Sequence, residues 1–318
     1  MSKKTNVENQ EKFKTSIGGQ AIIEGILMLG PQKQAIVVRG KEGLVTKVEE
    51  RKLSKDRHPI LGWPLVRGIV NFGSSMVTGV KALMYSASFY PDDEEEKPSR
   101  MEQWFEKKFG SSALEKLIIY FSVVLGIAFS IFLFIFLPTL ISGLFNGLIK
   151  SYLIRNLIEG GLRILIFLGY LIGVSQMKDM KRVFSYHGAE HKTIRCYEAK
   201  LPLTVENVRK QSRMHPRCGT SFLFLVVVIS ILFFAILRAD NIFLRLAMRL
   251  LLLPVVVAVS YEITRYVGRH DNWFTKILTA PGMWFQNFTT QEPDDDMIEV
   301  AITAVTLVIP DEEGQDKW

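Results

Sequence analysis

The stretch L-I-I-Y-F-S-V-V-L-G-I-A-F-S-I-F-L-F-I-F-L-P-T-L-I-S-G-L-F-N-G-L-I at residues 117–149 decides the fold, because it contains no charged side chain. Its 33 residues exceed the roughly 20 that an apolar helix needs to cross a bilayer. The stretch predicts a first transmembrane helix over about 118–144, which Pro138 kinks or ends. Hydrophobic residues make up 48% of the 318-residue chain, which also favours a membrane protein over a set of water-soluble domains.

Three further apolar segments complete the prediction of an α-helical integral membrane protein with about four transmembrane helices. They cover about 157–177, 219–237 and 246–266. The connection 178–218 carries ten Lys or Arg residues, whereas 145–156 and 238–245 carry two each. Because Lys and Arg gather in cytoplasmic loops, we expect a multi-pass protein whose N- and C-termini and central loop 178–218 are cytoplasmic.

The parts outside the membrane are expected to be small. Residues 1–15 are polar and predict a disordered tail, and 16–60 contain three runs of strand-forming residues, which predict a small β unit. Residues 61–90 predict an amphipathic helix, and 91–99 an acidic linker ahead of the membrane domain 100–270. Residues 271–318 predict an interfacial segment rich in aromatic side chains and a C-terminal helix.

Charge and cysteine content narrow the function classes. The net charge of +7 is accounted for by basic cytoplasmic loops, so the bilayer is an expected partner and nucleic acid is not. Two cysteines, Cys196 and Cys218, are too few for a disulfide framework. Cys196 is expected to be a small buried thiol. No phosphate-binding loop, dinucleotide-binding glycine pattern or nucleophile elbow is found.

The stretch Y-H-G-A-E-H-K-T at 186–193 is the strongest candidate for chemistry, and it is expected in the central loop. His187 and His191 are four residues apart, so on a helix they lie on one face and can grip one metal ion. Neutral imidazole binds zinc well, and Glu190 beside the two histidines has the position of a general base in the H-x-x-E-H motif of zinc peptidases. The alternative is a polar loop whose histidines bind headgroups or backbone.

Other residues can complete a site around this motif. His215 and Cys218, in M-H-P-R-C-G-T at 214–220, have a spacing that suits a second half of a tetrahedral site. Glu262, at the cytoplasmic end of the fourth span, is a possible distant ligand or an ion-pair partner of Arg265. Glu24, among isoleucines, is either solvent-facing or part of the site. Four ligands indicate a structural metal, whereas three ligands plus water indicate catalysis, and the spacing does not choose between them.

The chain contains four motifs in order, which are G-G-Q-A-I-I-E-G-I-L-M-L-G-P at 18–31, Y-H-G-A-E-H-K-T at 186–193, H-P-R-C-G-T-S-F at 215–222 and T-T-Q-E-P-D-D-D at 289–296. Together they resemble the YqhQ-like family of uncharacterised bacterial multi-pass membrane proteins. The resemblance covers nearly the whole chain and implies a predicted metal-dependent enzyme in the inner (plasma) membrane of a bacterium. It supplies no reaction.

Two functions from different classes follow from the sequence. The first is a membrane-embedded, zinc-dependent hydrolase of the cytoplasmic face, for instance a peptidase with a protein or peptide substrate. It would use Glu190 as base and draw its ligands from His187, His191, His215, Cys218 and Glu262. The second is a non-catalytic membrane scaffold or regulator in which a structural metal fixes the central loop. A transporter is a weaker third reading, because the spans contain few polar groups.

Overall fold

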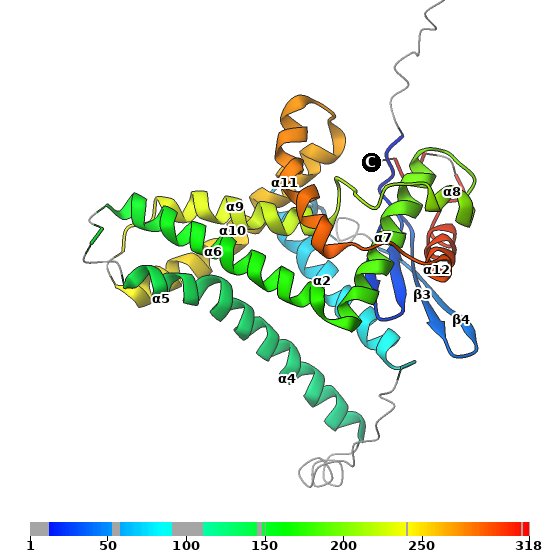
Figure 1. Cartoon of the computed structure of the whole chain (residues 1–318), viewed down its shortest axis with the longest axis horizontal. Helices are drawn as coiled ribbons and strands as arrows, with labels where there is room; N and C mark the ends of the chain where they lie inside the picture. Colours follow the sequence, from blue (N-terminus) through cyan, green and yellow to red (C-terminus); the bar gives the residue numbers. More distant parts are fainter. Residues whose placement is uncertain are drawn as a thin grey trace, which may run out of the picture. The chain divides into compact units, whose positions relative to one another are not determined.

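The computed structural model describes residues 13–52, 58–90, 111–144, 148–149, 151–239, 241–312 and 314–317 (Figure 1). The chain forms two compact units, of which the first contains Met1–Tyr90, Leu171–Val226 and Val257–Trp318 and the second Pro91–Tyr170 and Val227–Val256. The described residues are mostly helical with a small N-terminal antiparallel sheet, which confirms the expected fold class at that level. Most of the expected tail at 1–15 and all of the acidic linker at 91–99 lie outside the described residues.

The sheet of the first unit consists of two tight hairpins. Strands β1 (Gly18–Ile22) and β2 (Gly25–Leu29) form the first, and β3 (Lys33–Gly40) and β4 (Gly43–Glu50) form the second. Each strand pairs antiparallel with the next, so the order is β1-β2-β3-β4 and the edges are β1 and β4.

The sequence predicted three strands, and the structure has four because the first run folds back on itself. The turn is made by Ile23 and Glu24, and Glu24 adopts a φ of 48°. Gly25 then begins β2, where an added Cβ would lie 2.4 Å from the carbonyl oxygen of Val37. Only glycine tolerates this approach of β3.

Both faces of the sheet are covered by helices of the first unit. Ile22, Leu27 and Val38 pack on one face against Ala82 of α2 (Val66–Ala87), which follows the short η1 (Pro59–Gly62). The other face packs against α7 (Lys178–Glu198) and α12 (Asp295–Thr306). The core on that side combines Ile26, Met28 and Val37 with Tyr186 and Ala189 of α7 and with the small residues of α12.

The basic segment expected as a loop is largely helical. Residues 178–198 form α7, since apolar and small side chains at helical spacing, among them Tyr186, Ala189 and Ile194, can be buried on the sheet. A short helix, α8 (Val205–Arg209), follows, with Thr204 capping its first turn. The C-terminal part contains α11 (Trp273–Thr289), which begins in a capping box at Asn272, and α12, which is capped by Asp294.

Among the residues that the structure describes, three helices are long and apolar enough to cross a membrane. The first candidate span, Leu117–Gly143, combines α4 (Ser111–Ile131), a π-helical turn η2 (Phe132–Phe136) and α5 (Leu137–Gly143). The others are α6 (Tyr152–Gln176) and α10 (Ile242–Arg269). The remaining predicted span is a shorter apolar helix, α9 (Gly219–Ala235), of 17 residues.

The second unit contains a buried ionic cluster. Glu159 of α6 accepts hydrogen bonds from Arg249 of α10, from Nη2 of Arg163 at 3.3 Å and from Thr139 Oγ1 of α5 at 2.9 Å. All four side chains are almost completely buried. The guanidinium groups of Arg163 and Arg249 also lie 5.0 and 5.4 Å from the ring centre of Phe234 in α9. The cluster therefore links the helices of this unit.

Candidate metal centre

Helix α7 presents two histidines and a glutamate on one side while its other side is in the core. Tyr186 and Ala189 are buried against the sheet, at 1% and 0% exposure. His187, Glu190 and His191 are not part of that apolar core, and Glu190 contacts the Gly19 amide of β1. Residues three and four apart share a helix face, so His187 lies on one face with Glu190 and His191. The expected alignment of the two histidines is therefore produced by a helix.

The segment after α11 approaches α7 at Gly188, the one glycine of that helix. An added Cβ at Gly188 would lie 2.0 Å from the carbonyl oxygen of Gln291, and the Gln291 amide donates to the Phe184 carbonyl at 2.9 Å. Nδ1 of His187 lies 2.8 Å from the carbonyl oxygen of Thr289, the last residue of α11 before that segment. The close packing that Gly188 permits thus places a backbone acceptor next to His187.

Backbone carbonyls define the tautomer of both histidines. Nδ1 of His187 contacts the Thr289 carbonyl, and Nδ1 of His191 contacts the Arg213 carbonyl at 2.6 Å. A carbonyl oxygen only accepts, so each Nδ1 carries the hydrogen and donates it. In the neutral rings the lone pair is then on Nε2. Such orientation by an outer partner is typical of metal-ligating histidines.

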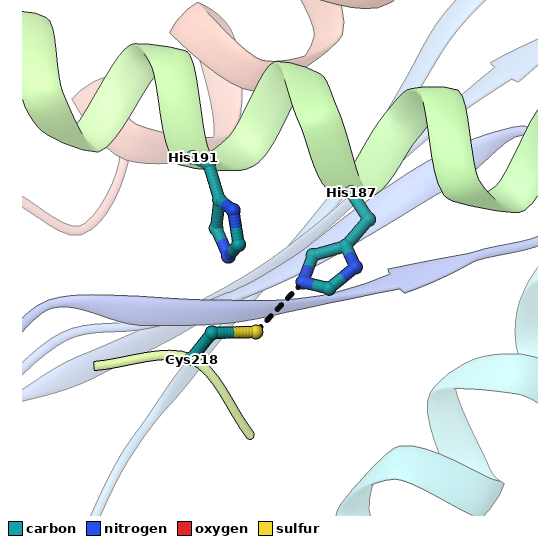
Figure 2. A group of neighbouring side chains, drawn as sticks. All are labelled: His187, His191 and Cys218. Carbon is teal, nitrogen blue, oxygen red and sulfur yellow. Dashed lines mark hydrogen bonds between the residues drawn. The ribbon is translucent and has the colours of Figure 1, made fainter. Parts of the chain in front are cut away.

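Cys218 completes a three-residue cluster, which Figure 2 shows converging from α7 and from the segment directly before α9. Its Sγ lies 3.1 Å from Nε2 of His187. One ligand atom from each of His187, His191 and Cys218 lies within 4.8 Å of the other two, so the cluster can hold a metal ion. A tetrahedral zinc site with bonds of about 2.0–2.3 Å has donor atoms roughly 3.3–3.6 Å apart, so small side-chain adjustments suffice.

The electrostatic environment of Cys218 favours its deprotonated form, which is the form that binds a metal. Burial raises the pKa of Cys218, but the charges and hydrogen bonds of His187 and His191 outweigh burial and hold this pKa well below its usual range. The Thr220 amide also donates to Sγ at 3.4 Å, at the start of α9. Burial lowers the pKa of His187, while the Cys218 thiolate and Glu190 raise it, to about 9. Both shifts favour a thiolate on Cys218 beside a protonated His187.

Glu190 lies between the sheet edge and the cluster. Its Oε1 accepts a hydrogen bond from the Gly19 amide of β1 at 3.0 Å. Its Oε2 lies 3.6 Å from Nε2 of His191 and 4.0 Å from Nε2 of His187. One carboxylate oxygen is therefore held by the backbone of β1, and the other faces the atoms that would bind a metal.

His215 lies next to the cluster but is engaged elsewhere. Its ring centre is 5.5 Å from that of His191, and its Nε2 lies 3.4 Å from Oε2 of Glu198. Glu198 also forms an ion pair with Arg217. Burial lowers the pKa of His215, and the hydrogen bond to Glu198 opposes this shift. Within the part of the chain that the structure describes, the His187, His191 and Cys218 group does not include His215.

The other sequence-predicted candidates lie outside this group. Glu262 accepts hydrogen bonds from Nε of Arg67 at 2.8 Å and from the Leu65 amide at 3.2 Å, so its ion-pair partner is Arg67 of α2. Cys196 is fully buried, with Sγ 3.6 Å from the Pro202 carbonyl oxygen. Glu24 pairs with Arg182 of α7 and accepts from the Tyr186 hydroxyl at 3.2 Å, which fastens the first hairpin to that helix.

Sequence reasoning missed the groups that orient the motif. The Thr289 and Arg213 carbonyls carry no side-chain signal, so only the fold reveals them. Glu198 had a usable signal, because it lies seven residues, about two helical turns, after His191 on α7. Gly19 belonged to a conspicuous glycine pair, but nothing in the local pattern linked it to Glu190.

Comparisons with known proteins agree with the resemblance that the motifs suggested. Residues 63–311 match the model of a family described as "Protein of unknown function (DUF1385)". The chain is 34% identical over 299 residues to "Uncharacterized protein YqhQ" of Bacillus subtilis (strain 168), covering 92% of each chain. No solved structure matches. The expected relationship to YqhQ-like proteins is confirmed, and the metal-enzyme part of that expectation depends on the site itself.

Proposed function

Because this chain belongs to the DUF1385 family, whose description gives no activity, we propose a function from the site: a membrane-bound, metal-dependent hydrolase of amide bonds. His187, His191 and Cys218 would hold the ion, and Glu190 would be the general base. The observation that carries the proposal is the convergence of three ligand atoms with one carboxylate oxygen of Glu190 facing them. Three protein ligands leave a coordination position open, as in catalytic rather than structural sites.

A membrane location is supported by the exposed surface of the candidate spans. In α4, Phe121, Val124 and Leu125 are 65%, 64% and 57% exposed, although all three are large and apolar. Such a surface is stable in lipid and unfavourable in water. We place the protein in the plasma membrane of a bacterium, with both termini and α7 on the cytoplasmic side, because ten basic residues lie at 178–218.

The donor set fits zinc. One thiolate and two imidazoles with lone pairs on Nε2 are ligands that zinc prefers, and hard cations such as magnesium prefer oxygen ligands. A divalent ion bound there would act as a Lewis acid toward water and toward a substrate carbonyl. The lowered pKa of Cys218 favours the thiolate, which is the form of cysteine that binds a metal.

Glu190 is positioned to move one proton through the reaction. Its Oε1 is fixed by the Gly19 amide, so Oε2 is the oxygen that faces the reacting groups. This oxygen takes a proton from water as the water oxygen bonds to the carbonyl carbon. The same proton then goes to the amide nitrogen as the carbon–nitrogen bond breaks, so that amide and water give acid and amine.

A structural metal is the second candidate, and one observation favours it. The three ligands belong to α7 and to the residue directly before α9, and His187 is also bonded to the last residue of α11, so an ion would join three parts of the first unit. In that case Glu190 would be an outer hydrogen-bond partner, and its charge would matter little for function.

Metal content and the Glu190→Gln variant separate the two candidates. The protein is purified in detergent, its zinc is counted, and a library of peptides is incubated with it and analysed by mass spectrometry. A hydrolase keeps its zinc in Glu190→Gln and loses cleavage, whereas His191→Ala loses both. A structural site gives no cleavage in any form and a lower unfolding temperature in His191→Ala. Absence of stoichiometric metal from the wild type overturns both candidates.

A further inference from the structure

The candidate metal centre lies along an edge of the sheet. Strand β1 is the first in the order β1-β2-β3-β4, so one of its sides has no partner strand. The Gly19 amide on that side donates to Glu190, which places the edge within hydrogen-bond distance of the proposed base. A chain lying along this edge would therefore pass the groups that could cleave it.

The register of the hairpin identifies the backbone groups that point outward from β1. In an antiparallel pair, residues alternate between facing the partner strand and facing away. Gly19, opposite Met28, faces away because its amide donates to Glu190. Ala21, two residues on and opposite Ile26, must face the same way. Among the described residues, no hydrogen bond to the Ala21 amide or carbonyl is found outside the hairpin.

The two edges of the sheet differ in how they are protected. Exposed edge strands are usually blunted by charged side chains, and β4 carries Lys47, Glu49 and Glu50 on exposed positions. Strand β1 reads Gly-Gly-Gln-Ala-Ile and has no charge. Residues 18–21 are only half-buried, and two of the four are glycines, which carry no side chain. Small, uncharged side chains on an edge strand allow another backbone to approach.

We propose that β1 binds the substrate as an added β-strand, so that the substrate class is a polypeptide segment in extended conformation. This inference rests on the proposed hydrolase function. The Ala21 amide and carbonyl would pair with the substrate backbone, and the next substrate residues would pass Glu190 and the His187, His191 and Cys218 cluster. Recognition by main-chain hydrogen bonds supplies affinity for any extended sequence, while side-chain pockets would supply selectivity.

The test measures binding, with probes that separate metal contact from strand addition. Zinc-loaded full-length protein in detergent is titrated in a calorimeter with acetohydroxamate, with an alanine tripeptide hydroxamate, and with the same tripeptide N-methylated at its central amide. Two additional main-chain hydrogen bonds should make the tripeptide bind about tenfold more tightly than acetohydroxamate. N-methylation should remove most of that gain.

Two proline variants locate the effect on the sheet. Ala21→Pro removes the outward amide of β1, and Thr46→Pro is the matched control. Gly40 and Gly43 flank the turn between β3 and β4 and face each other, so by the same alternation the amide of Thr46 faces outward on β4. Ala21→Pro should bind acetohydroxamate normally and lose the tripeptide gain, and Thr46→Pro should keep both. The proposal is overturned if the wild type binds the N-methylated tripeptide as tightly as the parent. If no zinc is bound, the hydrolase function itself fails.

Discussion

At the scale of single residues, Gly188 and the two Nδ1 atoms decide whether α7 can present metal ligands. A histidine pair on a helix face is common, but here each ring is fixed by a backbone carbonyl, from Thr289 and from Arg213. The Thr289 contact depends on the tight approach of the following segment to Gly188. The geometry of the site is therefore encoded partly by a residue that has no side chain.

Gly188→Ala should disturb both stability and metal binding. The new Cβ would lie 2.0 Å from the Gln291 carbonyl oxygen, so the segment must move and His187 loses its acceptor. Overpacking of this kind costs about 1–3 kcal/mol. Thermal unfolding and zinc content in detergent measure the effect. Gly73→Ala in α2 is the control, since nothing lies within 4 Å of its added Cβ, and it should be neutral or slightly stabilising.

Glu24→Gln should make the protein less sensitive to acid. Burial raises the pKa of Glu24, but the hydrogen bonds and charge of Arg182 outweigh burial and lower the pKa below its usual range. A carboxyl whose folded-state pKa is lowered stabilises the fold above its unfolded pKa of about 4.3 and loses that contribution as the pH falls through the folded value. The difference in unfolding temperature between wild type and Glu24→Gln should therefore be greatest at neutral pH and shrink below pH about 4.3. A difference independent of pH would contradict this account.

At the scale of elements, periodicity predicted most of the helices, and tertiary contacts decided the rest. The apolar run at 117–149 and the acidic start of 295–306 are strong local signals, and helices occupy both regions. The basic segment containing His187 is polar on average, and its helix α7 exists because a few residues such as Tyr186 and Ala189 pack on the sheet. The convergence of Cys218 on that helix depends on segments that are far apart in sequence.

The ionic cluster of the second unit is another feature that no local sequence pattern predicts. Arg163 and Arg249 lie within apolar helices, and both form ion pairs with Glu159. In a low-dielectric environment a polar network of this kind joins helices and is costly to break. The sequence shows that such charged residues are unusual within apolar helices, but it does not show which of them contact one another.

Glu159→Gln should destabilise the second unit strongly. Removal of the carboxylate leaves the buried guanidinium groups of Arg163 and Arg249 without their shared counter-charge, which costs about 3–5 kcal/mol. The unfolding temperature in detergent should fall, while zinc content of the folded fraction is unchanged. The double variant Glu159→Gln/Arg249→Met should be less destabilised than the sum of the two single variants. Strict additivity would show that the two side chains are not coupled.

At the scale of the whole molecule, the chain forms one unit that contains the sheet and a second unit made of apolar helices. Composition predicted the apolar helices, and loop charge supports our orientation of them. Composition did not indicate which polar residues come together to form the candidate metal centre. Of the five ligand candidates, three have ligand atoms close enough to share one ion, while His215 and Glu262 are bonded to Glu198 and Arg67.

X-ray absorption at the zinc edge of the purified protein tests this central claim most directly. An open three-ligand site predicts one sulfur at about 2.3 Å and three nitrogen or oxygen neighbours at about 2.0 Å, two of which are imidazoles. Cys218→Ser should remove the sulfur shell, and His215→Ala should leave the spectrum unchanged. A third imidazole that disappears in His215→Ala would contradict the account, and so would a wild-type spectrum without sulfur.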